Sequence, residues 1–233
     1  EEAGAEEAGA VAPSAAHAAA AVPVVQRLVS GWHRGLVLEV PASPTALEQA
    51  LGADAGTYDQ IAAVTAAADG SAEARAPVHV FVNREVFDGL GRTGAQVVIS
   101  HEATHVATGA WDSGAPLWLI EGFADYVALR DVVLPITRSA AQIIAAVRAD
   151  GPPRRLPGAA AFGTHTPRLG ATYESAWLAC RVIAGQAGEH ALVAFYRAVD
   201  RGRRLGPALF ATTGLTIAGL TQRWRDYLEE LAG

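Results

Sequence analysis

Two histidines four residues apart flank a glutamate in the segment HEATH, residues 101–105. On a helix, this spacing places His101 and His105 on one face, close enough to bind one metal ion. Glu102 is one residue further round and would lie beside the ion rather than on it. The HExxH pattern is typical of sites where two imidazoles bind zinc and the glutamate acts as a general base. We therefore predict zinc ligands at His101 and His105 and a catalytic base at Glu102.

A third protein ligand is needed, because catalytic zinc has three protein ligands and one open position. Glu121 lies 16 residues after His105 in the apolar segment LWLIEGFADYVAL, 117–129, which also reads as a helix. A second, antiparallel helix could bring Glu121 beneath the two imidazoles. Asp125 is one turn further on the same face, where it could accept the remaining N–H of a zinc-bound histidine.

Simpler interpretations compete with this one. An exposed helix face could carry two histidines and a glutamate, but Val97, Val98, Ile99 and Val106 make this helix apolar, so unpartnered polar groups would be costly there. The site could also hold zinc without turnover and bind peptides or partners, although an idle site has no need of Glu102. Finally, the cluster could be a buried polar network in a purely structural domain.

The elements that must position these residues indicate an α+β fold. The segment 35–43 predicts a strand that Pro41 ends. Residues 61–66 are ambiguous by themselves, but the turn at 68–71 and the strand-like segment 78–83 predict an antiparallel pair. Residues 1–21 are low in complexity and predict a tail or a frayed helix, with His17 solvated. Residues 22–233 predict one domain, with the sheet and the HExxH helix in 22–112 and a helical part in 113–233. Helices are predicted over 24–32, 43–52, 96–108, 116–129, 139–151, 172–184, 189–200 and 216–231.

The two motifs together resemble the gluzincin metallopeptidases, the peptidase MA-like clan of thermolysin and aminopeptidase N. LWLIEGFADY is similar to the family's LWLNEGFA-x-Y, whose glutamate is the third zinc ligand and corresponds to Glu121. Asp125 follows by four residues, as in the thermolysin-type E-x-x-x-D arrangement. The resemblance covers roughly residues 94–200 and implies a zincin-like fold in a compact, minimal domain. The stretch before residue 75 has only a general likeness to actinobacterial peptidase-like domains.

The segment TYESAWLACRVIAGQAGEHALVAFYRAVDRG extends this resemblance. In the family a tyrosine at its start points at the scissile carbonyl, which implies an oxyanion-binding role for Tyr173. His165, in the loop GTHTP, is an alternative for that role. The three other histidines of the predicted domain have no partner pattern and predict structural or exposed positions: His33, His79 and His190. Cys180 and four tryptophans predict core or helix contacts: Trp111, Trp118, Trp177 and Trp224.

Composition narrows the substrate class. Aminopeptidases of this clan carry a G-x-M-E-N strand, but this chain has no Met and its only Asn is Asn83. We therefore expect an endopeptidase acting on peptides or proteins, with an extended substrate pairing along strand 78–83. The net charge of −6 without a basic stripe argues against nucleic acid, and no apolar run predicts membrane contact. Because the chain lacks an initial Met, we expect a processed product or an excised piece of a longer chain, with an extracytoplasmic location slightly favoured.

Overall fold

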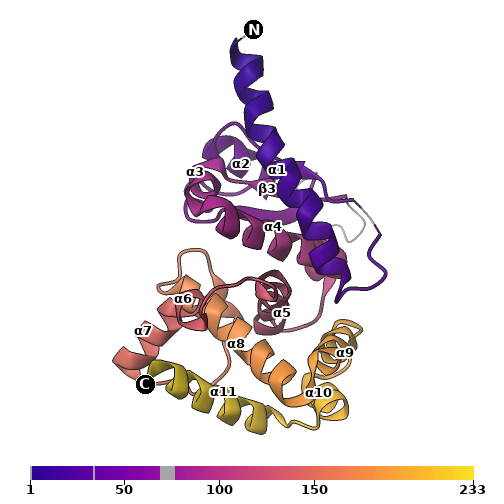
Figure 1. Ribbon diagram of the computed structural model, residues 1–233, viewed down its shortest axis with the longest axis vertical. Helices are drawn as coiled ribbons and strands as arrows, with labels where there is room; N and C mark the ends of the chain where they lie inside the picture. The colour runs from indigo at the N-terminus through magenta and orange to yellow at the C-terminus, as the bar shows by residue number, and fades with distance from the viewer. Residues whose placement is uncertain (1, 34, 69–76) are drawn as a thin grey trace. The chain divides into compact units, whose positions relative to one another are not determined.

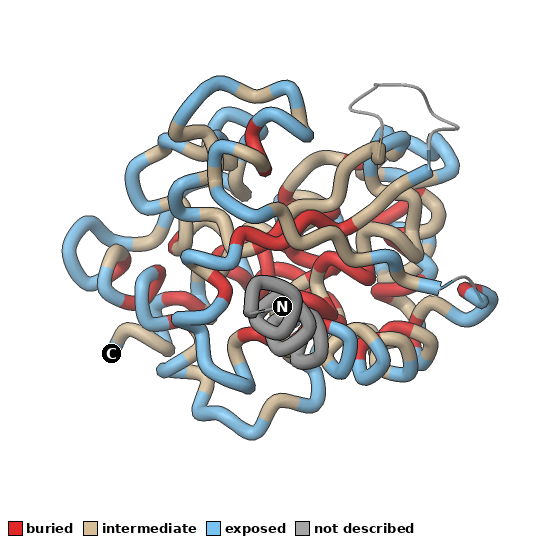
Figure 2. The backbone as a smooth tube through the Cα atoms, turned by 90° about the horizontal axis from the view of Figure 1, so that it is seen from above, coloured by how far each residue is buried: buried red, intermediate tan, exposed pale blue. Residues whose placement is uncertain are grey.

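The computed structural model describes residues 2–33, 35–68 and 77–233, with side chains from residue 14 onward. It is a mixed α+β protein, mostly helical, with a small sheet (Figure 1). By compactness the chain divides into two units, Glu1–Asp112 and Ser113–Gly233, which are described separately below. In both units buried positions recur along the helices between intermediate and exposed ones (Figure 2).

The first unit combines a three-stranded sheet with helices. The strand order is β1-β3-β2, with β1 parallel and β2 antiparallel to β3. The antiparallel pair confirms the prediction for β2 and β3, whereas the predicted turn falls mostly outside the described residues. The elements are α1 (Glu2–Gln26), β1 (Leu38–Glu39), α2 (Pro44–Leu51), β2 (Ala63–Ala67), β3 (Val78–Val82), α3 (Arg84–Phe87), η1 (Asp88–Leu90), α4 (Gly91–Thr108) and η2 (Ala110–Asp112).

The position of β3 corrects one expectation. We expected strand 78–83 to offer an edge to a peptide, but β3 is central and has a neighbour on each side. Its residues Val80, Phe81 and Val82 are at most 1% exposed, so they belong to the core. Such an apolar run is typical of a strand covered on both faces. Within the described residues, the longer strand with an unpaired side is β2.

The segment predicted as a tail or a frayed helix is helical and forms the first part of α1. This helix continues through residue 21 to Gln26 and packs on α4, with Ala21 fully buried. His17 is not simply solvated: its Nδ1 lies 3.0 Å from Gln96 Oε1, and Gln96 Nε2 donates to the His17 carbonyl. Alanines bury little apolar surface, but their small side chains allow two helices to approach closely. The prediction from composition did not include this close packing.

The second unit is entirely helical in its regular structure. Helix α8 packs against α5, α7, α9 and α11. The buried Trp224 indole N–H on α11 donates to the Ser175 carbonyl on α8. The elements are α5 (Leu117–Leu129), α6 (Ile136–Ser139), α7 (Ala141–Asp150), η3 (Ala159–Phe162), α8 (Leu169–Ala187), α9 (Glu189–Asp200), α10 (Leu205–Thr213) and α11 (Ile217–Ala232).

Helices α5 and α8 cross at Gly122. A Cβ built on Gly122 would lie 2.4 Å from the Ala176 carbonyl oxygen and 3.1 Å from Cys180 Sγ. The obstacle is main chain, which cannot rotate away as a flexible side chain can. The glycine of EGFAD therefore sets how closely the helix that carries Glu121 lies against α8.

We expect Gly122→Ala to destabilise the protein by about 1–3 kcal/mol, because the added methyl group overpacks this crossing. Gly185→Ala is the matched control: it lies on α8, and a Cβ there meets nothing within 4 Å. That change should be neutral or stabilise by about 0.5–1 kcal/mol, since alanine is the better helix former. Urea unfolding of both variants measures the difference. Equal stability of the two variants would contradict the close-packing account.

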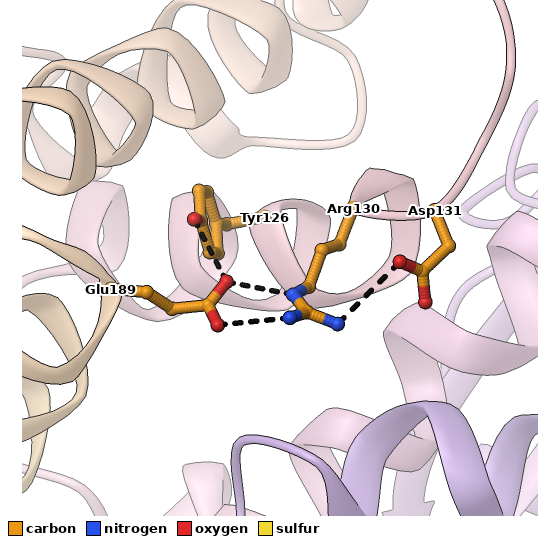
Figure 3. Close-up of polar contacts among 4 residues, drawn as sticks. All are labelled: Tyr126, Arg130, Asp131 and Glu189. Carbon is orange, nitrogen blue, oxygen red and sulfur yellow. Dashed lines mark hydrogen bonds and ion pairs between the residues drawn. The ribbon is translucent and has the colours of Figure 1, made fainter.

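A charged cluster joins α5 to the start of α9 (Figure 3). Arg130 donates from Nε and Nη2 to the two carboxylate oxygens of Glu189, at 2.7 and 3.0 Å. The Tyr126 hydroxyl donates to the same carboxylate at 3.0 Å, and Asp131 lies 3.5 Å from Arg130 Nη1. The pKa of Tyr126 is raised to about 12, mainly because the hydroxyl is buried and to a lesser extent because of the negative charge of Glu189. The bidentate geometry fixes the orientation of α9 on α5.

No helix in the described part of the chain is both long and apolar enough to cross a membrane. Two side-chain expectations can also be assessed here. Trp118, Trp177 and Trp224 are buried, as predicted, whereas Trp111 is 46% exposed and is not a core residue. Cys180 is fully buried, which confirms its prediction as a packing residue.

Candidate metal centre

Helix α4 positions the histidine pair. It runs from Gly91 to Thr108 and ends at Gly109, whose left-handed φ of 68° provides the C-cap. His101 Nε2 and His105 Nε2 lie 2.9 Å apart, and the rings meet edge to face. The two imidazoles therefore direct the same ring nitrogen to one point. Both side chains are half-buried.

Glu102 lies on the side of α4 that faces the sheet. It is only 7% exposed. The Thr65 hydroxyl, on β2, donates to Glu102 Oε2 at 2.6 Å and lies 3.2 Å from the Glu102 main-chain oxygen. The carboxylate is thus held by a strand that is 37 residues away in sequence. Nothing in the alanine-rich segment around Thr65 signalled this contact.

Glu121 completes a group of three metal-binding side chains. It lies on α5, and one ligand atom from each of His101, His105 and Glu121 lies within 4.8 Å of the other two. This group could hold a metal ion. Ligands 2.0–2.1 Å from a tetrahedral zinc would be about 3.3 Å apart, so the histidine pair already has nearly the required spacing. Two imidazoles and one carboxylate also form a ligand set that suits zinc.

Asp125 lies four residues after Glu121 on α5 and is half-buried. Its charge contributes to the raised pKa of two α8 side chains, Glu174 and Cys180. For both groups burial is the larger cause, and Glu174 reaches a pKa of about 7. Glu174 Oε2 also accepts the Ile143 main-chain N–H at 2.7 Å, at the start of α7. No local pattern in the sequence points to Glu174. The role of Asp125 beside a zinc-bound histidine stays a prediction.

The two residues considered for oxyanion binding differ in their surroundings. Tyr173 is half-buried on α8, and its ring packs edge to face on Phe162 with centroids 5.4 Å apart. His165 is exposed in the loop before α8. Burial therefore favours Tyr173 of the two, and the oxyanion-binding role stays a prediction. Of the remaining histidines, His33 and His190 are exposed, and His79 pairs with Glu39 at 2.6 Å.

Comparison with known proteins adds no assignment: no family model, no curated protein and no solved structure matches the chain. The class of this protein therefore depends on its own residues, above all on the group His101, His105 and Glu121.

Proposed function

We propose that this chain is a zinc-dependent endopeptidase of the gluzincin type. The observation that carries the proposal is the convergence of His101, His105 and Glu121 within 4.8 Å, with the buried carboxylate of Glu102 adjacent in sequence to the first ligand. A purely structural polar network would not require three zinc-type ligands next to a separate carboxylate. The similarity of HEATH and LWLIEGFADY to the gluzincin motifs supports the same conclusion.

Each residue then has a distinct role. Zinc held by the three ligands would lower the pKa of a bound water to about 7 and polarise the substrate carbonyl. Glu102 removes a proton from the attacking water and delivers it to the leaving amine. The Tyr173 hydroxyl donates a hydrogen bond to the oxyanion, with His165 as the alternative donor. Asp125 orients a ligand histidine.

The substrate is an extended peptide, and β2 is the strand that receives it. The register of β2 on β3 determines which main-chain N–H and C=O groups of β2 could pair with a peptide. Asn83 N–H donates to the Ala62 carbonyl, and Ala68 N–H donates to the Pro77 carbonyl. Because bonding alternates along an antiparallel pair, Ala63, Thr65 and Ala67 direct their main-chain groups away from β3. These groups can pair with any sequence, so they give affinity with little selectivity.

The proposal predicts internal cleavage that depends on metal. Matched peptides with free and acetylated N-termini should be cut at the same internal bonds and at similar rates, since the chain lacks the G-x-M-E-N strand that would bind a free amine. A chelator should abolish cleavage, and added zinc should restore it. Product masses identify the bonds. Stepwise loss of N-terminal residues that acetylation prevents would contradict the endopeptidase assignment. Stoichiometric zinc without any cleavage would instead favour a zinc-holding module that binds peptides.

A further inference from the structure

The hydrogen bond between Thr65 and Glu102 is the shortest polar contact described for the proposed base. At 2.6 Å it has the length of a charge-assisted bond between a hydroxyl and a carboxylate. Glu102 is 7% exposed and Thr65 is half-buried, so water competes little for either group. The contact joins the edge strand β2 directly to the HExxH helix α4.

The side chain and the main chain of Thr65 face different neighbours. Its Cα is paired with Val80, and its side chain lies on the face of the sheet that meets α4. Its main-chain N–H and C=O are directed to the unpaired side of β2, as the register above requires. One residue therefore contacts the proposed base with its side chain and presents main-chain groups where a peptide would pair.

We propose that Thr65 is a positioning residue that holds the Glu102 carboxylate in a fixed relation to the peptide bound along β2. This inference rests on the proposed function. The Thr65 hydroxyl donates to Oε2, and in this role Oε1 is the oxygen that takes the proton from water. The Glu102 main-chain oxygen, at 3.2 Å, is a second acceptor within reach of the same hydroxyl.

Three variants distinguish the effect of the Thr65 hydroxyl on catalysis from the effect of the side-chain shape. Thr65→Val keeps the β-branched shape and the main chain but removes the donor, so kcat should fall about 10- to 100-fold while KM stays within about twofold. Thr65→Ser keeps the donor and should recover most of kcat. Thr108→Val is the matched control, because its hydroxyl donates to a carbonyl within α4 at 2.8 Å. It should leave kcat near the wild-type value.

A second measurement does not depend on turnover. Unfolding midpoints of the metal-free wild type, Thr65→Val, Glu102→Ala and the double variant form a double-mutant cycle. The two single changes should be clearly non-additive, since either one already breaks the same hydrogen bond. A wild type without turnover would count against the proposed function, while this cycle would still report on the contact.

Two results would overturn the role of Thr65: an unchanged kcat in Thr65→Val, or equal losses in Thr65→Val and Thr65→Ser. Additive midpoints in the cycle would overturn the hydrogen bond itself. In each of these cases an active wild type would leave the endopeptidase proposal intact.

Discussion

Glu102→Gln should lower the rate of peptide hydrolysis by about 10²–10⁴-fold while the zinc content stays at the wild-type level. Glutamine has nearly the same shape, and its amide oxygen can still accept the Thr65 hydroxyl that lies 2.6 Å from Glu102 Oε2. The side chain therefore stays in place, but it cannot take a proton from water. The measurements are kcat on an internally cleaved peptide and metal content by elemental analysis.

The same substitution at an exposed glutamate provides the control. Glu85, on α3, is exposed, so Glu85→Gln should retain full turnover. Two outcomes would contradict the assignment of Glu102. Full activity in Glu102→Gln would exclude it as the base, and loss of zinc from that variant would make it a ligand instead.

Local sequence signals predicted some helix ends but not all: the segment predicted as a helix over 24–32 leaves the helical conformation after Gln26, where α1 ends. Ser43 accepts the Ala46 N–H, and Gly52 ends α2 in the left-handed conformation, as the pair Ser43–Pro44 and the later glycine indicated. Gly109 ends α4 in the same way. Such ends depend on residues within one turn, so a sequence pattern can indicate them. Helix α10 was not among the predicted helices; its Pro207 lies in the first helical turn, where proline is tolerated.

Pairings between distant segments could not be predicted in the same way. The expectation of a free edge at residues 78–83 was wrong because β1, only two residues long, pairs with β3 on its other side. A contact of that kind leaves no periodicity in the sequence. The Thr65–Glu102 bond is similar: it depends on which strand lies next to α4 and in which register.

In the candidate site, too, local spacing predicted some residues, whereas others depend on contacts between distant segments. The four-residue spacing of His101 and His105 requires only that the segment be helical, and it placed the two Nε2 atoms together. The prediction of Glu121 as the third ligand depended on where a second helix lies, and it was supported by the resemblance to known motifs. The raised pKa of Glu174 depends on burial and on Asp125, which no local pattern reveals.

His105→Ala should lose most of the bound zinc, because one imidazole and one carboxylate are too few protein ligands for a catalytic zinc site. His190→Ala, at an exposed position on α9, is the control and should keep the metal. Purification without chelator followed by elemental analysis should give near-stoichiometric zinc for the wild type and for the control. Chelation should lower the melting temperature of these two proteins but not that of His105→Ala, since an ion that binds only the folded state stabilises it.

Glu121→Gln extends the test to the third ligand. The amide is a weaker zinc ligand than the carboxylate, so we expect this variant to lose zinc during dialysis that the wild type withstands. The same chemical change then has opposite consequences at two glutamates: Glu102→Gln keeps zinc and loses turnover, whereas Glu121→Gln loses both. Full zinc retention in both His105→Ala and Glu121→Gln would remove the basis for a metal centre at His101, His105 and Glu121, even though their ligand atoms lie within 4.8 Å of one another.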